Sequence, residues 1–296
     1  MKINVVCGGN SKEREVSLRS GIAVANGLIA KGHTVKIMDT SASDQELLSC
    51  DVTFPVLHGV GGEDGSFQLR LENLGIAYAG SDSKSSALCM DKSAYRDFMI
   101  SNGFLMPEGA ILNLSDYANS IFANQPHVIK PVNGGSSIDT LIIRDADNID
   151  RFTVEELFKT HSKMVVEQLI IGDELTVGIL NEEVLPAIEI IPPADGEFDY
   201  ENKYNGKTQE LCPPKNVSES IQLEAKELCL KVHEAAGCRD FSRTDFMIAD
   251  DEKIYLLETN TIPGMTEQSL FPKMALTAGI NMPELVDRIV SLAVSR

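Results

Sequence analysis

The chain of 296 residues contains no tryptophan, and no run of apolar residues in it approaches the length of about 18–20 that a membrane-spanning helix needs. The start, MKINVVCGGNSKERE, lacks the apolar core of a signal peptide. The six cysteines form no CxxC pair and the five histidines form no HExxH pattern, which argues against a zinc site and a disulfide framework. Basic residues are scarce, since 26 Lys and Arg accompany 44 Asp and Glu, giving a formal net charge of −18. Because this surplus of acid repels polyanions, we expect a protein that binds neither nucleic acid nor anionic membranes. The missing membrane span and signal-peptide core predict a cytoplasmic protein.

Two common nucleotide-binding motifs are also missing. Residues 206–208 (GKT) look like the end of a P-loop, but Glu201 stands where the pattern requires its first glycine. The segment CGGNS at 7–11 follows a predicted strand without the third glycine of a dinucleotide-binding GxGxxG. The sequence therefore argues against a P-loop enzyme and against hydride transfer.

The hydropathy pattern predicts an α/β fold with an α+β C-terminal part. In the first eighty residues, strand-like runs at 3–7, 34–38 and 52–57 alternate with helical stretches, of which the clearest lies within 12–31. This is βαβ patterning and predicts a parallel sheet. One further helical stretch is predicted at 85–103.

We divide the chain into an N-terminal α/β domain at 1–80, a central part at 81–167 and a C-terminal part at 168–296. The C-terminal part includes a stretch at 192–215 that is rich in Pro, Gly, Asp, Asn and Lys, which is typical of a loop.

A candidate anion site lies at 130–137, KPVNGGSS. A predicted strand ends in Lys130, and the following loop offers backbone N–H groups and the hydroxyls of Ser136 and Ser137. An ordinary glycine turn with a surface lysine is the alternative.

The most informative stretch is a predicted β-hairpin at 242–260. In a symmetric pairing Asp245 faces Glu258 and Arg243 faces Asn260, and alternation along the strands places all four side chains on one face. Two facing carboxylates repel unless a cation or a proton lies between them. An all-oxygen set suits Mg²⁺, which usually completes its shell with water and substrate phosphates, so a nucleoside triphosphate is the expected co-ligand. A solvated polar strand face is the alternative.

Two neighbouring segments extend this site. A Pro263-Gly264 turn directly after the hairpin presents a backbone N–H that suits an oxyanion. The apolar strand at 164–170 ends in groups that suit an adenine amine and ribose hydroxyls, although a buried strand with a solvated end is the alternative. These groups are Glu167, Gln168, Leu169 and Glu174.

At this point the chain resembles the D-alanine:D-alanine ligase family of the ATP-grasp superfamily. Eight ordered segments carry the resemblance over nearly the whole chain, which makes it far more specific than any lone motif. They are GGNSKEREVSLRSG (8–21), LHGVGGEDGSFQ (57–68), MDK (90–92), IKPVNGGSS (129–137), VVEQLIIGDELTV (165–177), FDYENKY (198–204), SRTDF (242–246) and LLETNTIPGMTEQSLFPK (256–273). The resemblance implies a three-domain ATP-grasp architecture with an N-terminal parallel-sheet domain.

The resemblance also implies a role for each matching residue. Two Mg²⁺ ions, or Mn²⁺, are expected on Asp245, Glu258 and Asn260. ATP is expected on Lys92, Lys130, Ser137, Glu167, Gln168, Leu169, Glu174 and Lys203. The first D-alanine is expected to place its ammonium on Glu15, in a hydrogen-bonded chain with Ser136 and Tyr204, in a pocket lined by His58. The second is expected on Lys203, Ser269 and Leu270, with Arg243 and the Gly264 N–H at the oxyanion and the stretch at 192–215 as a lid.

Three functions compete on this basis. The first is ATP-dependent ligation of two D-alanine molecules through an acyl phosphate, for peptidoglycan precursor synthesis. The second is an ATP-grasp ligase that uses D-lactate or D-serine as its second substrate. Tyr204 beside Lys203 argues for an amine nucleophile, which counts against D-lactate. The third is a non-catalytic ATP-binding regulator, disfavoured because Glu15, Arg243 and the metal set are present. The resemblance implies a homodimer.

One departure from the family pattern affects the loop at 133–140. Family members continue the Gly-Ser-Ser sequence with an aliphatic residue and then glycine, whereas here Ile138 is followed by Asp139 and Thr140. An acidic side chain at this place bears directly on the roles of Ser136 and Ser137. From the sequence alone, we interpret Asp139 as a tolerated substitution.

Overall fold

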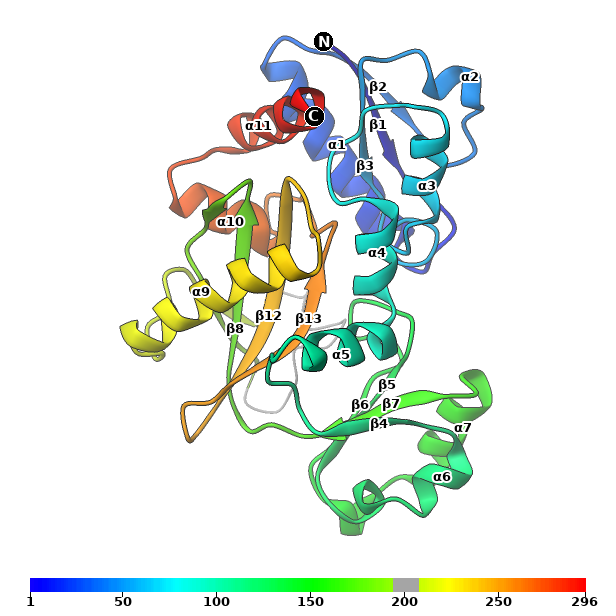
Figure 1. Cartoon of the computed structure of the whole chain (residues 1–296), viewed down its shortest axis with the longest axis vertical. Helices are drawn as coiled ribbons and strands as arrows, with labels where there is room; N and C mark the ends of the chain where they lie inside the picture. The colour runs from blue at the N-terminus through cyan, green and yellow to red at the C-terminus, as the bar shows by residue number, and fades with distance from the viewer. Residues whose placement is uncertain (194–207) are drawn as a thin grey trace.

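The computed structural model describes residues 1–193 and 208–296. Its N-terminal part contains a parallel sheet in the strand order β2-β1-β3 (Figure 1). Its elements are β1 (Lys2–Cys7), α1 (Arg14–Ala30), β2 (Thr34–Met38), α2 (Asp44–Leu47), β3 (Val52–Val56) and α3 (Ser66–Asn73). Val5 of the central strand packs with residues of α1 and of the C-terminal helix α11 (Met282–Ser295), whereas Val6 packs with residues of α3. Burial on both faces explains the continuous apolar run of β1 and confirms the predicted parallel sheet.

The helical stretch predicted at 85–103 is two helices, because Asp91 interrupts it. They are α4 (Ser83–Met90) and α5 (Lys92–Ser101). Asp91 has a non-helical backbone, and its carboxylate accepts hydrogen bonds from the backbone N–H groups of Ser93 and Ala94 at 2.9 and 3.0 Å. An aspartate cap of this kind starts a new helix. Lys92 thereby becomes the first residue of α5.

The central part is an antiparallel sheet in the order β4-β7-β5-β6. Its elements are β4 (Gly109–Leu112), α6 (Leu114–Ala118), η1 (Ile121–Asn124), β5 (His127–Pro131), β6 (Leu141–Ile143), η2 (Ala146–Asn148), α7 (Arg151–Thr160) and β7 (Met164–Gln168). Ile129 and Val166 are paired neighbours that pack with Phe158 of α7 on one face. Alternation along the strands therefore places Lys130 and Glu167 on the opposite face.

The C-terminal part is an antiparallel sheet in the order β11-β10-β8-β12-β13, with β9 paired to β8. Its elements are β8 (Gly172–Leu180), β9 (Glu183–Val184), β10 (Ile188–Ile191), β11 (Gln209–Leu211), α9 (Glu219–Ala235), β12 (Phe241–Ala249), β13 (Ile254–Asn260), α10 (Leu270–Thr277) and α11. Helix α9 packs against one face, together with α4 and α5, and the other face shares a core with α1, α10 and α11 (Figure 1). Parts of the chain far apart in sequence therefore share one hydrophobic core.

The predicted hairpin has the expected register at its functional end. Asp245 pairs with Glu258 and Arg243 pairs with Asn260. A β-bulge follows Asp245 and shifts the register by one residue, so that Phe246 pairs with Leu256. The symmetric pairing therefore holds only for the polar end, and the bulge readjusts the strands toward the turn.

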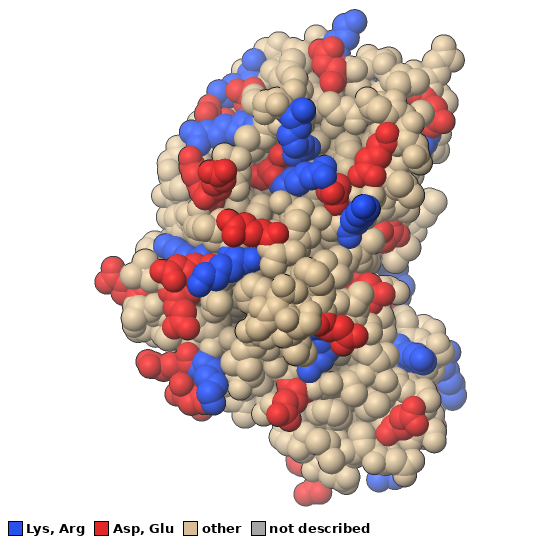
Figure 2. Space-filling view, in the orientation of Figure 1, with Lys and Arg blue, Asp and Glu red and all other residues tan. Residues whose placement is uncertain are grey.

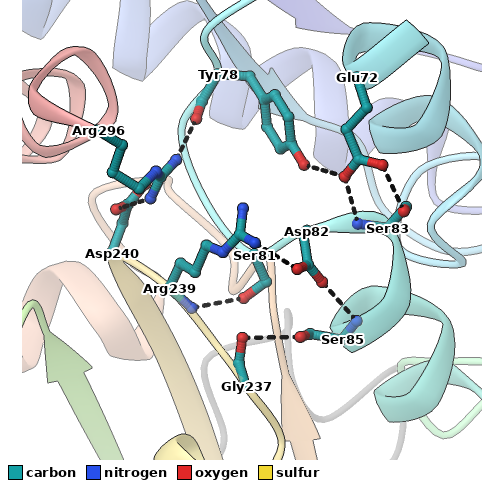
Figure 3. A network of polar contacts seen from close by, with 10 residues as sticks. All are labelled: Glu72, Tyr78, Ser81, Asp82, Ser83, Ser85, Gly237, Arg239, Asp240 and Arg296. Carbon is teal, nitrogen blue, oxygen red and sulfur yellow. Dashed lines mark hydrogen bonds and ion pairs between the residues drawn. The ribbon is translucent and has the colours of Figure 1, made fainter.

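A polar network fastens the end of the N-terminal domain to the turn before β12 (Figure 3). Arg239 forms an ion pair with Asp82 at the start of α4. Arg296 forms an ion pair with Asp240 and donates a hydrogen bond to the Tyr78 carbonyl oxygen at 2.8 Å. The Asp240 side chain is only 4% exposed, and burial raises its pKa. Because a buried carboxylate is costly without partners, these contacts stabilise one arrangement of the two parts.

Charged side chains are spread over the surface, and Figure 2 shows acidic and basic groups intermingled on the visible face. Lys31, which directly follows α1, forms ion pairs with Glu284 and Asp287 of α11, at 2.5 and 3.7 Å from its Nζ. Within residues 1–193 and 208–296, no helix has both the length and the apolar character needed to cross a membrane.

Candidate active site

Two cavities meet at the end of the β12–β13 hairpin. The first, of about 470 Å³, lies between α1, the loop after β3 and the turn after β13. The second, of about 340 Å³, lies between the central and C-terminal sheets. Glu258 and Gly135 line both of them. The two cavities are therefore neighbours that share part of their walls.

The expected site residues divide between these cavities. The first is lined by His58, Ser136, Arg243, Asn260, Gly264, Ser269 and Leu270. The second is lined by Lys92, Lys130, Ser137, Glu167, Gln168, Leu169, Glu174 and Asp245. Lys203, Tyr204 and most of the expected lid at 192–215 lie outside the described residues.

Asp245 accepts four hydrogen bonds from neighbouring side chains. It is 8% exposed and accepts two hydrogen bonds from Arg243, at 2.9 Å from Nε and 2.8 Å from Nη2. Thr176 Oγ1 donates at 2.5 Å and Asn260 Nδ2 at 3.2 Å. These four bonds occupy the roughly four acceptor positions of a carboxylate. The opposite carboxylate, Glu258, lies 3.4 Å from Lys92 Nζ, so a cation accompanies each of the two facing acids.

Among the described residues, Lys92 and Lys130 of the second cavity are held in place by neighbouring groups. Lys92 Nζ donates a hydrogen bond to the Gly134 carbonyl oxygen at 2.6 Å. Lys130 Nζ lies 2.5 Å from Glu167 Oε1, and the side chains of this pair are 14% and 7% exposed. Two lysine ammonium groups fixed in one cavity can each donate charge-assisted hydrogen bonds to phosphate oxygens.

The structure places Glu13, and not Glu15, in the first cavity. Glu13 precedes α1, is 6% exposed and accepts a hydrogen bond from Ser136 Oγ. A Cβ atom added to Gly59 would lie 2.8 Å from Glu13 Oε2, and one added to Gly135 would lie 3.2 Å from it. Two glycine-containing loops therefore close around the Glu13 carboxylate. Glu15 is exposed and does not line the cavity. Glu13 lies just before α1 and Glu15 lies on its exposed first turn, so the structure favours Glu13 over Glu15 for the role expected of Glu15.

Two further groups of the first cavity lie in the segment 57–68. Glu63 accepts a hydrogen bond from the Gly59 N–H at 2.7 Å, and burial together with the neighbouring Glu13 carboxylate raises its pKa. Burial lowers the pKa of His58 to about 4, so the imidazole is neutral at physiological pH. Its Nε2 has no hydrogen-bond partner among the described residues. Glu63 was missed because the sequence signal of this segment lies in its glycines, and the burial of the carboxylate depends on the fold.

Two family models and a curated relative match this chain. Residues 113–291 match the family model of the D-ala D-ala ligase C-terminus, and residues 29–81 match that of the N-terminus. A curated D-alanine–D-alanine ligase from Desulforudis audaxviator is 40% identical over 306 aligned residues, covering 100% of this chain and 99% of the relative.

Solved structures give the same result. A D-alanine–D-alanine ligase from Bacillus anthracis, complexed with ATP, matches with a TM-score of 0.84 and 30% identity, covering 100% of this chain and 98% of that one. The VanG D-Ala:D-Ser ligase from Enterococcus faecalis matches with a TM-score of 0.83 and 27% identity, covering 99% of each chain. With this fold, these two adjoining cavities and this similarity over its full length, the chain belongs to the D-alanine–D-alanine ligase family.

Proposed function

We propose that the protein joins two D-alanine molecules into D-alanyl-D-alanine at the expense of ATP, for peptidoglycan precursor synthesis. The observation that carries the proposal is the meeting of two cavities at Glu258 and Gly135. One cavity contains fixed lysines, and the other contains a buried carboxylate, Glu13, together with Arg243. Such a pair can bring the γ-phosphoryl group of a nucleotide to the carboxylate of an amino acid.

The second cavity is proposed to bind ATP. Lys92 and Lys130 would contact the phosphates, and the end of β7 with the start of β8 would contact adenine and ribose. The latter groups are Glu167, Gln168, Leu169 and Glu174. Phosphoryl transfer depends mainly on positioning and charge neutralisation, which fixed cations provide.

The oxygen atoms of Asp245, Glu258 and Asn260 fit Mg²⁺, with Mn²⁺ as an alternative. In the structure, the amide of Asn260 donates to Asp245 Oδ2. A half-turn of this amide would present its oxygen instead and free one acceptor position on Asp245. Bound Mg²⁺ would neutralise phosphate charge during transfer.

The first cavity is proposed to bind the two amino acids. The Glu13 carboxylate would bind the ammonium of the first D-alanine. Ser136 orients the Glu13 carboxylate by donating a hydrogen bond to it. Ser269 and Leu270 lie at the beginning of α10, and the positive end of the helix dipole favours the carboxylate of the second D-alanine. Arg243 and the Gly264 N–H would stabilise the oxyanion.

The reaction then has two steps. A carboxylate oxygen of the first D-alanine attacks the γ-phosphorus, and ADP leaves to give an acyl phosphate. The amine of the second D-alanine, after losing a proton, attacks the acyl carbon, and inorganic phosphate leaves. Arg243 lies at the hairpin end beside Asp245, where it can meet negative charge in both steps.

The identity of the second substrate is the main alternative. D-serine is supported by the likeness to the D-Ala:D-Ser ligase, and D-lactate by the shared acyl-phosphate chemistry. A non-catalytic ATP-binding regulator on the same scaffold is the third possibility. Lys203 and Tyr204, which would discriminate among these, lie outside the described residues.

Release of phosphate from ATP tests the proposal. The full chain with Mg²⁺ is given D-alanine, L-alanine, or D-alanine together with D-serine or D-lactate, and products are identified by mass spectrometry. We expect stimulation by D-alanine alone, with D-alanyl-D-alanine as the main product. No stimulation above background would refute a D-alanine ligase, and a mixed product as the main one would favour the alternative substrate.

Two further properties are part of this proposal. We place the enzyme in the cytoplasm, where ATP and the precursors are available. A homodimer remains a prediction of the family resemblance, and light scattering of the purified chain would test it.

A further inference from the structure

The loop at 133–140, here called the glycine–serine loop, forms the wall between the two cavities. Gly135 lines both of them, Ser136 lines the first, and Ser137 and Ile138 line the second. Ser136, Ser137 and Asp139 have left-handed backbone conformations, with φ of 54°, 54° and 59°. Such conformations are unfavourable for residues other than glycine, so contacts with neighbouring segments must hold the loop.

Asp139 lines neither cavity and instead contacts two other segments. Its Oδ2 lies 3.2 Å from Nζ of Lys12, in the segment that precedes α1, and 2.9 Å from Nε2 of His161, between α7 and β7. His161 and Lys12 hold the pKa of the Asp139 carboxyl below its usual range. The carboxylate is therefore charged at neutral pH and connects the loop to both segments.

The contact with Lys12 lies beside a second contact between the same two segments. Glu13, the neighbour of Lys12, accepts a hydrogen bond from Ser136. The two contacts join residues 127 and 123 positions apart in the sequence. Because Glu13 faces the first cavity and the glycine–serine loop also walls the second, movement of either segment changes both cavities.

We propose that Asp139 is a positioning residue that couples the occupancy of the two cavities. Its ion pair with Lys12 holds the glycine–serine loop against the segment that carries Glu13. A nucleotide that orders the loop therefore also orders the amino-acid site, and by reciprocity the amino acid raises the affinity for the nucleotide. The identities of the two ligands rest on the proposed function.

Calorimetric titration of the full chain measures this coupling directly. A non-hydrolysable ATP analogue with Mg²⁺ is titrated with and without saturating D-alanine, and the ratio of the two Kd values is the coupling factor. Lys12→Met removes a cation whose side chain is 70% exposed, so it should not disturb folding. Lys12→Arg keeps the cation and is the matched control. Asp139→Gly removes both ion pairs and also relieves the strain of the left-handed backbone. Comparing it with Lys12→Met separates the effect of the lost contact from the effect of the relieved strain.

We expect Lys12→Met and Asp139→Gly each to reduce the coupling factor by about two- to fivefold, the range for partly exposed ion pairs. The double variant should lose no more than either single one, and Lys12→Arg should stay within about twofold of the wild type. The Kd of the analogue without D-alanine should stay unchanged in Lys12→Met, which a merely structural role of the pair does not predict.

An unchanged coupling factor in Lys12→Met, or additive losses in the double variant, would overturn the inference. Dipeptide formation by the wild type, measured separately, keeps the two proposals distinguishable. Dipeptide formation without any coupling refutes only the role of Asp139, and coupling without dipeptide formation refutes only the proposed reaction.

Discussion

Replacing Glu13 by glutamine removes one negative charge from the first cavity and preserves the length of the side chain. Glu13 is 6% exposed and accepts a hydrogen bond from Ser136. The glutamine carbonyl oxygen can still accept that bond, so the wall of the cavity should keep its shape. The change therefore removes mainly the attraction for the ammonium group of the first D-alanine.

The size of the effect follows from the burial of this carboxylate. A hydrogen bond to a charged group contributes about 1.5–3 kcal/mol, which corresponds to an increase in KM of about 10- to 150-fold for the first D-alanine. At saturating D-alanine the KM for ATP should change little, because Glu13 does not line the second cavity and the glutamine keeps the bond to Ser136. The melting temperature should not fall, because the substitution also removes the repulsion between Glu13 and Glu63.

Glu15→Gln is the matched control, since it is the same chemical change two residues further along the chain. Glu15 is exposed on the first turn of α1. We expect an effect of at most about 0.5 kcal/mol, or roughly twofold in KM. The assay is ADP release at saturating ATP with D-alanine varied, with thermal unfolding of both variants as the check on folding. A larger rise in KM for Glu15→Gln than for Glu13→Gln would refute the assignment of Glu13.

Two other predictions concern the hairpin and the core. Glu258→Gln should lower kcat at least about 100-fold, because it removes a charged oxygen from the proposed Mg²⁺ ligands, and such a ligand contributes several kcal/mol. A near-normal kcat in Mg²⁺ would contradict that ligand set. Circular dichroism checks that the variant is folded. Burial lowers the pKa of His233 to about 4, so the unfolded chain binds more protons between about pH 4 and 6.5, and stability falls as pH drops through that window. His233→Asn keeps a partner for Ser242 Oγ, which lies 2.6 Å from Nδ1. Between pH 7 and pH 5, the free energy of unfolding measured in urea should fall by about 2 kcal/mol less in His233→Asn than in the wild type. Equal decreases would contradict the pKa shift.

The polar end of the hairpin was predictable from the sequence because its information is local. Alternation along a strand has a period of two, so the positions of Asp245 and Glu258 relative to Arg243 and Asn260 follow once the turn is recognised. The bulge after Asp245 was not predictable, because the alternation of side chains does not show where the pairing of β12 with β13 shifts. The same local reasoning located Lys130 at the end of β5.

The helix around residue 91 shows where local patterns become ambiguous. Apolar periodicity continues through 85–103, and it favours one helix. The Asp91 side chain instead caps α5, and the chain there also bridges to Asn133 of the glycine–serine loop. A contact with a segment about forty residues away therefore helps to decide a local boundary, and it places Lys92 beside Gly134.

The sequence by itself determined the α/β class, the parallel N-terminal sheet, the paired acids of the hairpin and the family resemblance. Each of these depends on the order and spacing of residues along one segment. Only the tertiary structure showed that Glu13 is buried in the first cavity while Glu15 is exposed, and only it gave Asp139 its two partners. Lys12 contacts Asp139, and Glu13 contacts Ser136, across more than one hundred residues of sequence. Such contacts form only when the loops fold together.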